Sequence, residues 1–140
     1  RIPLGVSRVV RTGKDLTIVA TGVMVKKSLD AAEKLATEGI EVTVIDPRTL
    51  SPLDMSTTFD SVESTGRLLV VQEGPSHGGF INEVVAQVAG SHVFGSLKAP
   101  IKKVAGLNIP IPYAPQLEKA AVPQIDDIYA AAAEIVKNWR

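Results

Sequence analysis

The stretch VQEGPSHGGFINEVVAQVAG, residues 71–90, combines residue types that could bind an anion or move a proton. Histidine, here His77, is a residue type that can act as an acid or a base, and Gly78 and Gly79 stand directly before residues with helical apolar spacing. The backbone amides and the positive dipole end of a helix that starts there favour a negatively charged group. A lone loop histidine is more often a surface or hydrogen-bonding residue than a catalytic one. We therefore predict an anion-binding or subunit-contact loop at His77, Gly78 and Gly79.

Three carboxylates, those of Asp46, Asp54 and Glu73, lie at or just beyond the ends of expected strands, where open α/β sheets carry function. Each also has a structural interpretation. Asp54 can cap a helix, Asp46 can shape a turn, and Glu73 can accept hydrogen bonds from loop amides. Arg48 could form a bidentate pair with Asp46 or Asp54. We expect Asp46, Arg48 and Asp54 to fasten a strand-to-helix turn, and we predict no catalytic residue in the chain.

Composition and missing motifs exclude several function classes. Fifteen basic and fifteen acidic residues leave no net charge, which argues against nucleic acid as a partner. The chain has no cysteine for disulfides or thiolate metal sites, and its apolar runs are too short to span a membrane. It lacks a dinucleotide-binding glycine fingerprint, a Walker loop and a nucleophile elbow, and His77 and His92 are not spaced as a metal pair. We expect a soluble protein with no metal ligand and no membrane contact.

The elements that must position these residues alternate between strand and helix. Buried strands are expected at 16–20, 42–45, 68–71 and 101–104, and an antiparallel edge strand at 6–10. Helices are expected at 23–38, from Asp54 to Gly66, after Gly79, and from Pro123 to the end. Strands separated by helices of this length indicate a mostly parallel sheet that is covered on both faces.

Helical spacing also predicts which side chains face the core. The first helix is expected to bury Val25, Leu29, Ala32 and Ala36, and the last helix Ile128, Ala132, Ile135 and Trp139. Asp126 and Asp127 stand in the first turn of the last helix, where acidic side chains complement the helix dipole.

A proline-rich segment, LNIPIPYAPQLEKAAVP (107–123), precedes the last helix. Its prolines stiffen a stretch that carries Tyr113, Leu117 and Glu118, and ordered loops of this length are usually functional. It suits a contact with another subunit. The alternative is a strap that packs over the edge of the sheet.

A length of 140 residues suits a single domain. The chain begins RIPLGVSRVV, without an initiator methionine or a targeting segment, and we interpret it as part of a longer polypeptide.

Four stretches together resemble one family: GIEVTVIDPRTLSPLD (39–54), GRLLVVQEG with HGGF (66–80), LKAPIKKVAG (97–106) and IPYAPQLEKAAVP (111–123). They resemble the carboxy-terminal, transketolase-like domain of the β subunit of thiamine diphosphate-dependent 2-oxoacid dehydrogenases. The run RTLSPLD is more similar to the pyruvate and acetoin enzymes than to the branched-chain ones.

The resemblance implies a three-layer α/β/α domain with a five-stranded mixed sheet, with residues 1–5 as a linker from an upstream pyrimidine-binding domain. It implies a parent enzyme that uses thiamine diphosphate and Mg²⁺, both bound outside this chain. The implied partners are the α subunit, a second β subunit and the subunit-binding domain of a dihydrolipoyl acyltransferase. The implied compartment is the cytoplasm in a bacterium, and the mitochondrial matrix or a plastid in a eukaryote.

Lys98 departs from the family pattern. Many pyruvate-type relatives have Leu-Asp-Ala-Pro where this chain has LKAP, and that aspartate is thought to meet basic residues of the acyltransferase. The docking candidates are Lys98 itself, Tyr113, Glu118, Asp126 and Asp127, and we favour docking through the acidic groups. The alternative function is an independent doubly wound module that binds an anion at the helix start after Gly79.

Overall fold

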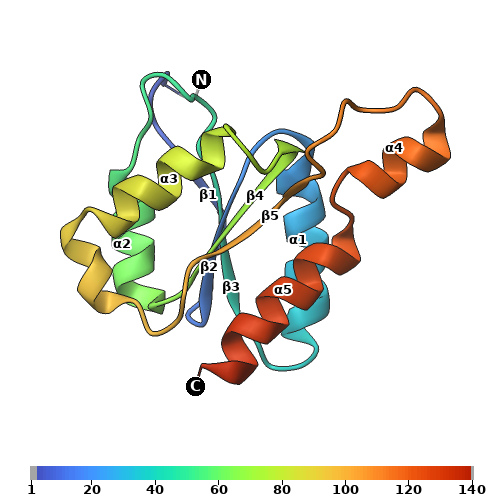
Figure 1. The fold of residues 1–140 in the computed structure, drawn as a ribbon. Coiled ribbons are helices and arrows are strands. Elements are labelled where there is room, and N and C mark those ends of the chain that lie inside the picture. Colours follow the sequence, from blue (N-terminus) through green and yellow to red (C-terminus); the bar gives the residue numbers. More distant parts are fainter. Residues whose placement is uncertain (1–2, 140) are drawn as a thin grey trace.

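A five-stranded mixed sheet in the order β1-β3-β2-β4-β5 runs through the middle of the molecule (Figure 1). The computed structural model describes residues 3–139. The strands are β1 (Arg8–Arg11), β2 (Leu16–Ala20), β3 (Val42–Asp46), β4 (Leu68–Pro75) and β5 (Lys102–Gly106). Strand β1 pairs with β3 in the antiparallel sense, and the other pairings are parallel. The predicted mixed sheet with an antiparallel edge strand is confirmed.

Helices cover both faces of this sheet, as the sequence predicts. They are α1 (Val23–Ala36), α2 (Ser56–Thr65), α3 (Phe80–Ala89), α4 (Pro115–Ala121) and α5 (Ile125–Asn138), with a 3₁₀ turn η1 (His92–Ser96). Helices α1 and α5 pack on one face, and α2 and α3 on the other (Figure 1). Among the described residues, no helix is both long enough and apolar enough to cross a bilayer.

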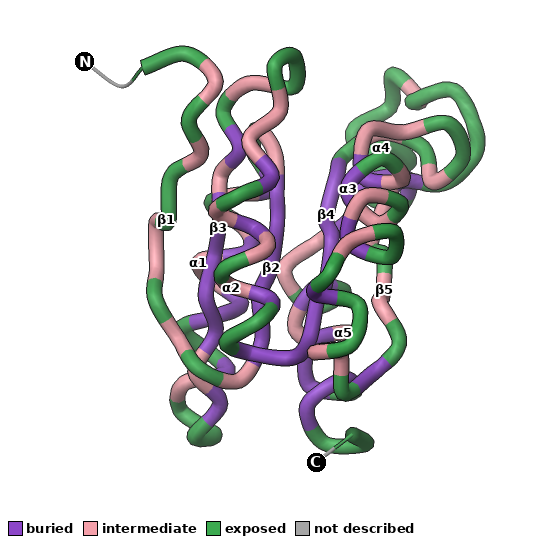
Figure 2. The backbone as a smooth tube through the Cα atoms, turned by 90° about the vertical axis from the view of Figure 1, so that its left-hand side faces the viewer, coloured by how far each residue is buried: buried purple, intermediate pink, exposed green. Residues whose placement is uncertain are grey.

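The central strands bury side chains on both faces. Leu16, Ile18 and Ala20 pack under α1 and α5, while Val19 belongs to the cluster under α2 and α3. This alternation follows from the two-residue period of a strand. Figure 2 shows β2 and most of β3 and β4 as buried, whereas β1 and α4 lie at the surface. The run LTIVA reads as continuous apolar sequence because both of its faces are covered.

Two predicted helix faces need correction. In α1 the expected Ala32 is fully buried, together with Met24, Ala31 and Leu35. The other three expected residues, Val25, Leu29 and Ala36, are only partly buried. In α5 the buried residues include Ile128, Ala132 and Ile135 as expected. Trp139, however, follows the last turn of α5 and is 48% exposed. The helix ends before the tryptophan, so the helical period no longer directs that side chain to the core.

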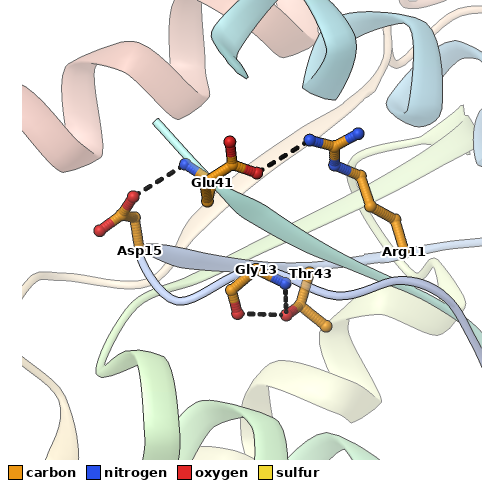
Figure 3. A network of polar contacts seen from close by, with 5 residues as sticks. All are labelled: Arg11, Gly13, Asp15, Glu41 and Thr43. Atoms are coloured by element: carbon orange, nitrogen blue, oxygen red, sulfur yellow. Dashed lines mark hydrogen bonds and ion pairs between the residues drawn. The ribbon is translucent and has the colours of Figure 1, made fainter. Parts of the chain in front are cut away.

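The connection from β1 to β2 is fixed against β3 by the polar network in Figure 3. Thr43 Oγ1 accepts from Gly13 N at 2.8 Å and donates to Gly13 O at 2.7 Å. A Cβ at Gly13 would lie 2.3 Å from Val42 N, so only glycine allows this approach. Asp15 Oδ2 accepts from Glu41 N at 2.8 Å, and Arg11 Nη2 pairs with Glu41 Oε2 at 2.9 Å. The network holds the end of β1 and the start of β2 in position beside β3.

Candidate functional site

Strands β2 to β5 run parallel, so the sheet has a carboxyl end and an amino end. The carboxyl end of the strands carries the turn after β3, the loop after β4 and the segment after β5. The amino end carries the residues that precede β2, β4 and β5, together with the last residues of α5. The sequence-predicted candidates lie at or near the carboxyl end, with the single exception of Lys98, which precedes β5. Functional groups of open α/β sheets gather at the carboxyl end.

Gln72, a buried residue of β4, organises the loop that holds His77. Its Nε2 donates to Pro75 O at 2.7 Å, and its Oε1 accepts from Ile81 N in the first turn of α3 at 3.2 Å. The amide side chain therefore occupies a donor of the helix start that an anion would need. Sequence reasoning missed Gln72, although a polar residue at the end of a buried apolar strand was the available signal.

The two glycines of the loop have different reasons to be glycine. Gly78 has a φ of +68°, and a Cβ added there would have no atom within 4 Å, so its requirement is conformational. Gly79 has a φ of −80°, which any residue adopts. A Cβ there would lie 1.9 Å from Gln72 Nε2. Gly79 is needed for close approach of the Gln72 amide.

The His77 side chain is exposed, and its backbone N–H donates to Asn108 Oδ1 at 3.0 Å. In the described structure its imidazole makes no hydrogen bond or ion pair with Glu73. Neighbouring bonds close the loop onto β5, because Lys103 Nζ donates to Asn82 Oδ1 at 3.0 Å and Asn82 Nδ2 donates to Ser76 O at 3.1 Å. The loop is held as a connection between β4, α3 and β5.

The turn after β3 is fastened differently from the expectation. Arg48 has a φ of +63°, and its backbone N–H donates to Asp46 Oδ1 at 3.0 Å. Within residues 3–139 its guanidinium forms no ion pair with Asp46 or Asp54. The backbone of Arg48, and not its charge, takes part in the turn.

Asp54 organises the part of this connection that leads into α2. Its carboxylate accepts from Ser56 Oγ at 2.6 Å, from Thr57 Oγ1 at 2.9 Å and from Ser7 N at 2.9 Å. These bonds, led by the one from Ser56, hold the pKa of Asp54 well below its usual range. Helix α2 has Met55 as its N-cap, one residue later than predicted, yet Asp54 still receives Ser56 N at 3.0 Å. Asp54 also ties the segment before β1 to this turn.

The segment between β5 and α5 contains a short helix, α4, that the sequence pattern did not predict. We call residues 107–121 the arm; it projects from the body near the carboxyl end (Figure 1). Leu107 N donates to Ala121 O at 3.0 Å and closes the base of the arm. Its large apolar side chains are exposed, namely those of Leu107, Ile109, Ile111, Tyr113 and Leu117. This exposure disfavours the strap interpretation, since a strap would bury these groups against the sheet.

The predicted docking residues do not form one surface. Tyr113 and Glu118 lie on the arm, and Asp126 and Asp127 lie in the first turn of α5. Both aspartates have partners within the chain: Asp126 pairs with Lys34 at 3.3 Å, and Asp127 accepts from Gln124 N at 2.8 Å in a capping box. About 1.5 Å of rise per residue makes α5 roughly 20 Å long. This length separates Asp126 and Asp127, at the start of α5, from Lys98, which lies near Trp139 at the other end of the helix.

Lys98 lines a different feature, a pocket of about 590 Å³ at the amino end. Phe94, Leu97, Ile101 and Trp139 form its apolar lining. Arg67 lies next to it, only 8% exposed, and donates to Trp139 O and, at 3.2 Å, to Asp15 O. Sequence reasoning missed these residues, because only the fold brings segments that lie 72 positions apart together.

The described residues hold no cluster of three or more histidine and carboxylate side chains that could bind a metal ion. The His92 ring instead packs edge-on against Phe59, with ring centroids 5.8 Å apart. Neither end of the sheet therefore offers, among the residues described, a ligand set for a divalent cation.

Comparisons with known proteins give consistent matches. Residues 5–128 match the family described as transketolase, C-terminal domain. The chain is 47% identical over 139 residues to the beta subunit of acetoin:2,6-dichlorophenolindophenol oxidoreductase from Cupriavidus necator, covering 99% of this chain and 41% of that protein. It is 46% identical over 135 residues to the mitochondrial pyruvate dehydrogenase E1 component subunit beta-1 of Arabidopsis thaliana, covering 94% and 36%.

A solved split-gene transketolase, described as an inactive β4 tetramer, superposes with a TM-score of 0.84 at 30% identity. The match covers 100% of this chain and 45% of that one. The chain thus spans about two fifths of the length of the relatives it matches.

Proposed function

Because the chain belongs to the transketolase C-terminal domain family, we propose that it is the assembly domain of the β subunit of a thiamine diphosphate-dependent 2-oxoacid dehydrogenase, of the pyruvate or acetoin type. The parent enzyme oxidatively decarboxylates a 2-oxo acid or acts on acetoin, and this domain takes no part in the chemistry. The two curated relatives described above are beta subunits of such oxidoreductases, which supports the assignment. Its compartment is the bacterial cytoplasm or, in a eukaryote, the mitochondrial matrix or a plastid.

The exposure of apolar side chains on the arm is the observation that best supports an assembly role. A projecting segment that leaves several large apolar side chains in water, Tyr113 and Leu117 among them, is unfavourable in an isolated chain. Aromatic and aliphatic side chains of this kind are enriched where subunits meet. The occupant is the α subunit or the second β subunit of the parent enzyme, and the tetrameric relative supports a contact between subunits.

The cofactor belongs elsewhere in the assembly. Thiamine diphosphate brings a pyrophosphate and a Mg²⁺ ion, which require oxygen ligands and free amide donors. In the described part of the chain no carboxylate cluster is available, and Ile81 N, at the start of α3, already binds Gln72. The residues present do not fit the cofactor. The same occupation of the helix start disfavours an independent anion-binding module.

Docking to the acyltransferase core is a separate part of the proposal. Glu118 and Tyr113 are its best acidic and aromatic candidates, because both are exposed and neither side chain is engaged by another described residue. Asp126 and Asp127 are weaker candidates, since they already serve Lys34 and the start of α5.

The test replaces two apolar residues of the arm, Tyr113→Ser with Leu117→Ser, in the β subunit that carries this chain. After co-expression with its α subunit, sedimentation measures the assembled fraction, and we expect the double variant to lose most of the assembly while the melting of the domain is unchanged. Leu4→Ser is the matched control, because Leu4 is 87% exposed but lies outside the arm. Full assembly of the double variant would refute the role of the arm.

A further inference from the structure

Arg48 adopts a backbone conformation that costs the chain free energy. It is the one residue other than glycine with a positive φ, 63°, among the residues that the structure describes. An L side chain crowds the backbone in this left-handed region, and glycine adopts it without that penalty. The guanidinium does not offset the cost within residues 3–139, where it is exposed and forms no hydrogen bond or ion pair. Strain that the chain keeps at one residue points to a role of that side chain toward another molecule.

The turn after β3 presents this guanidinium from a fixed backbone. Arg48 N donates to Asp46 Oδ1 at 3.0 Å, and Thr49 N donates to Pro47 O at 2.7 Å. Thr49 Oγ1 accepts from Gly5 N at 2.9 Å, which ties the turn to the segment before β1. A side chain that projects from a fixed backbone loses less conformational freedom when a partner binds it.

A small cavity of about 220 Å³ lies beside Arg48, and Thr21, Gly22, Asp46 and Leu50 complete its lining. This volume lies below the roughly 300 to 1,000 Å³ that is typical of small-molecule pockets, and it suits a single carboxylate side chain. Two charged groups line the cavity. Asp46 already accepts the Arg48 N–H, whereas the guanidinium can form a bidentate pair with an incoming carboxylate.

Exposed aliphatic side chains border this cavity. Leu50 is 54% exposed, and Val23, which follows Gly22, is 52% exposed. A free anion would leave both side chains in water, whereas a protein surface would cover them. Val23 also lines a cleft together with Pro115 of the arm. The surface around Arg48 is therefore continuous with the arm along the carboxyl end of the sheet (Figure 1).

We propose that Arg48 is the charged anchor of a subunit contact, in which a carboxylate of a neighbouring subunit pairs with the guanidinium while aliphatic side chains of that subunit cover Leu50 and Val23. This inference rests on the proposed function and adds the chemistry of the partner to it. The arm supplies apolar area, and Arg48 supplies selection by charge, because a basic partner surface would meet the guanidinium with the same sign. Arginines in such contacts are frequent hot spots of binding energy.

The experiment uses the β subunit that carries this chain, assembled with its α subunit, and measures the dissociation constant by sedimentation over a dilution series. Arg48→Ala should raise the dissociation constant roughly tenfold or more, and Arg48→Glu should raise it further. Arg48→Lys should fall between the parent and Arg48→Ala, since an ammonium cannot form the bidentate pair. Added salt should weaken the parent assembly more than the assembly of Arg48→Ala.

Arg48→Gly separates binding from folding. It removes the guanidinium and also relieves the positive φ, so thermal melts should show a domain at least as stable as the parent while the dissociation constant rises as in Arg48→Ala. Lys14→Ala is the control and should leave assembly unchanged. Lys14 is likewise exposed and without a partner in the described chain, but it precedes β2, at the amino end of the sheet.

A parental dissociation constant in Arg48→Gly and Arg48→Ala would overturn the proposal. Equal effects of Arg48→Ala and Lys14→Ala, or of Arg48→Ala and Arg48→Glu, would overturn it as well. If Tyr113→Ser with Leu117→Ser lost assembly and the Arg48 variants did not, the arm would keep its role and Arg48 would have none. The opposite pattern would reject the arm and support Arg48, and parental subunits that do not associate would overturn both.

Discussion

The carboxyl and amino ends of the sheet differ in how far the chain satisfies its own polar groups. At the carboxyl end, Gln72 serves the start of α3 and Asp54 collects hydrogen bonds from Ser7, Ser56 and Thr57. At the amino end, Lys98 has no acidic partner in the part of the chain that the structure describes, and Arg67 keeps an unpaired Nε there. At the end where open sheets usually carry function, the helix start and the turn carboxylate have partners within the chain, whereas the side chains of Arg48 and Glu118 have none among the described residues.

This comparison distinguishes two kinds of candidate binding residue. A polar group that the chain already satisfies contributes to folding, and an external ligand would have to displace an existing bond. A charged group that the chain leaves unpaired is available to a partner. Residue type alone points to His77, Gly79 and Asp46, whereas the absence of side-chain partners among the described residues points to Lys98, Arg48 and Glu118. Four predictions can break or sharpen this distinction.

Gly79→Ala should have the largest effect. The added Cβ would displace the Gln72 amide and break its bonds to Pro75 O and Ile81 N, at a cost of about 3 kcal/mol in the free energy of unfolding. Gly78→Ala is the matched control and should cost only about 1 kcal/mol, because its φ of +68° is the sole difficulty. Urea denaturation measures both. Equal costs would mean that Gln72 does not organise the loop.

Arg67→Ala tests the amino end. Loss of the guanidinium leaves Asp15 O and Trp139 O without this donor, and we expect a cost of about 2 kcal/mol in the free energy of unfolding. Emission from Trp139 should shift to longer wavelength as the backbone at Trp139 loses this bond. Arg67→Lys should retain part of the stability, since one ammonium can serve one of the carbonyls. Unchanged stability and emission in Arg67→Ala would show that Arg67 does not fix the pocket wall.

Asp54→Ala should cost about 1 kcal/mol at neutral pH, because the turn loses an acceptor that water replaces only in part. The pKa of Asp54 is lowered on folding, so its carboxylate stabilises the chain above about pH 4 and loses that contribution as the pH falls further. The stability difference between parent and variant should therefore shrink on acidification. Denaturant titrations at several pH values measure it, and a difference independent of pH would contradict the assigned bonds.

Arg48→Gly should have the smallest effect, a gain of less than about 1 kcal/mol, because glycine relieves the positive φ of 63°. Arg48→Ala keeps that strain and should leave stability unchanged, since the described guanidinium forms no ion pair. Thermal melts of the two variants decide the matter. If both variants were destabilised, the guanidinium of Arg48 would stabilise the turn after all.

The prediction of the fold rested on local patterns that the structure preserves. The run LTIVA predicts a strand buried on both sides, and β2 is that strand. Gly66 predicts the end of a helix, and it caps α2 with a φ of 70°. The proline-rich segment left a subunit contact and a strap over the sheet edge as alternatives and did not predict α4, because three prolines near a short helical stretch obscure its period.

By itself the sequence determined the order and type of the main elements and the antiparallel edge, because strand and helix periods and turn residues act over a few neighbouring positions. The family followed from the resemblance of four motif stretches to known proteins. Only the tertiary structure decided which polar groups are satisfied. Gln72 meets Gly79 across a loop, Arg67 meets Trp139 across 72 positions, and Lys98 meets no acid among residues 3–139. Whether a polar group is satisfied depends on distances between segments that no local pattern encodes.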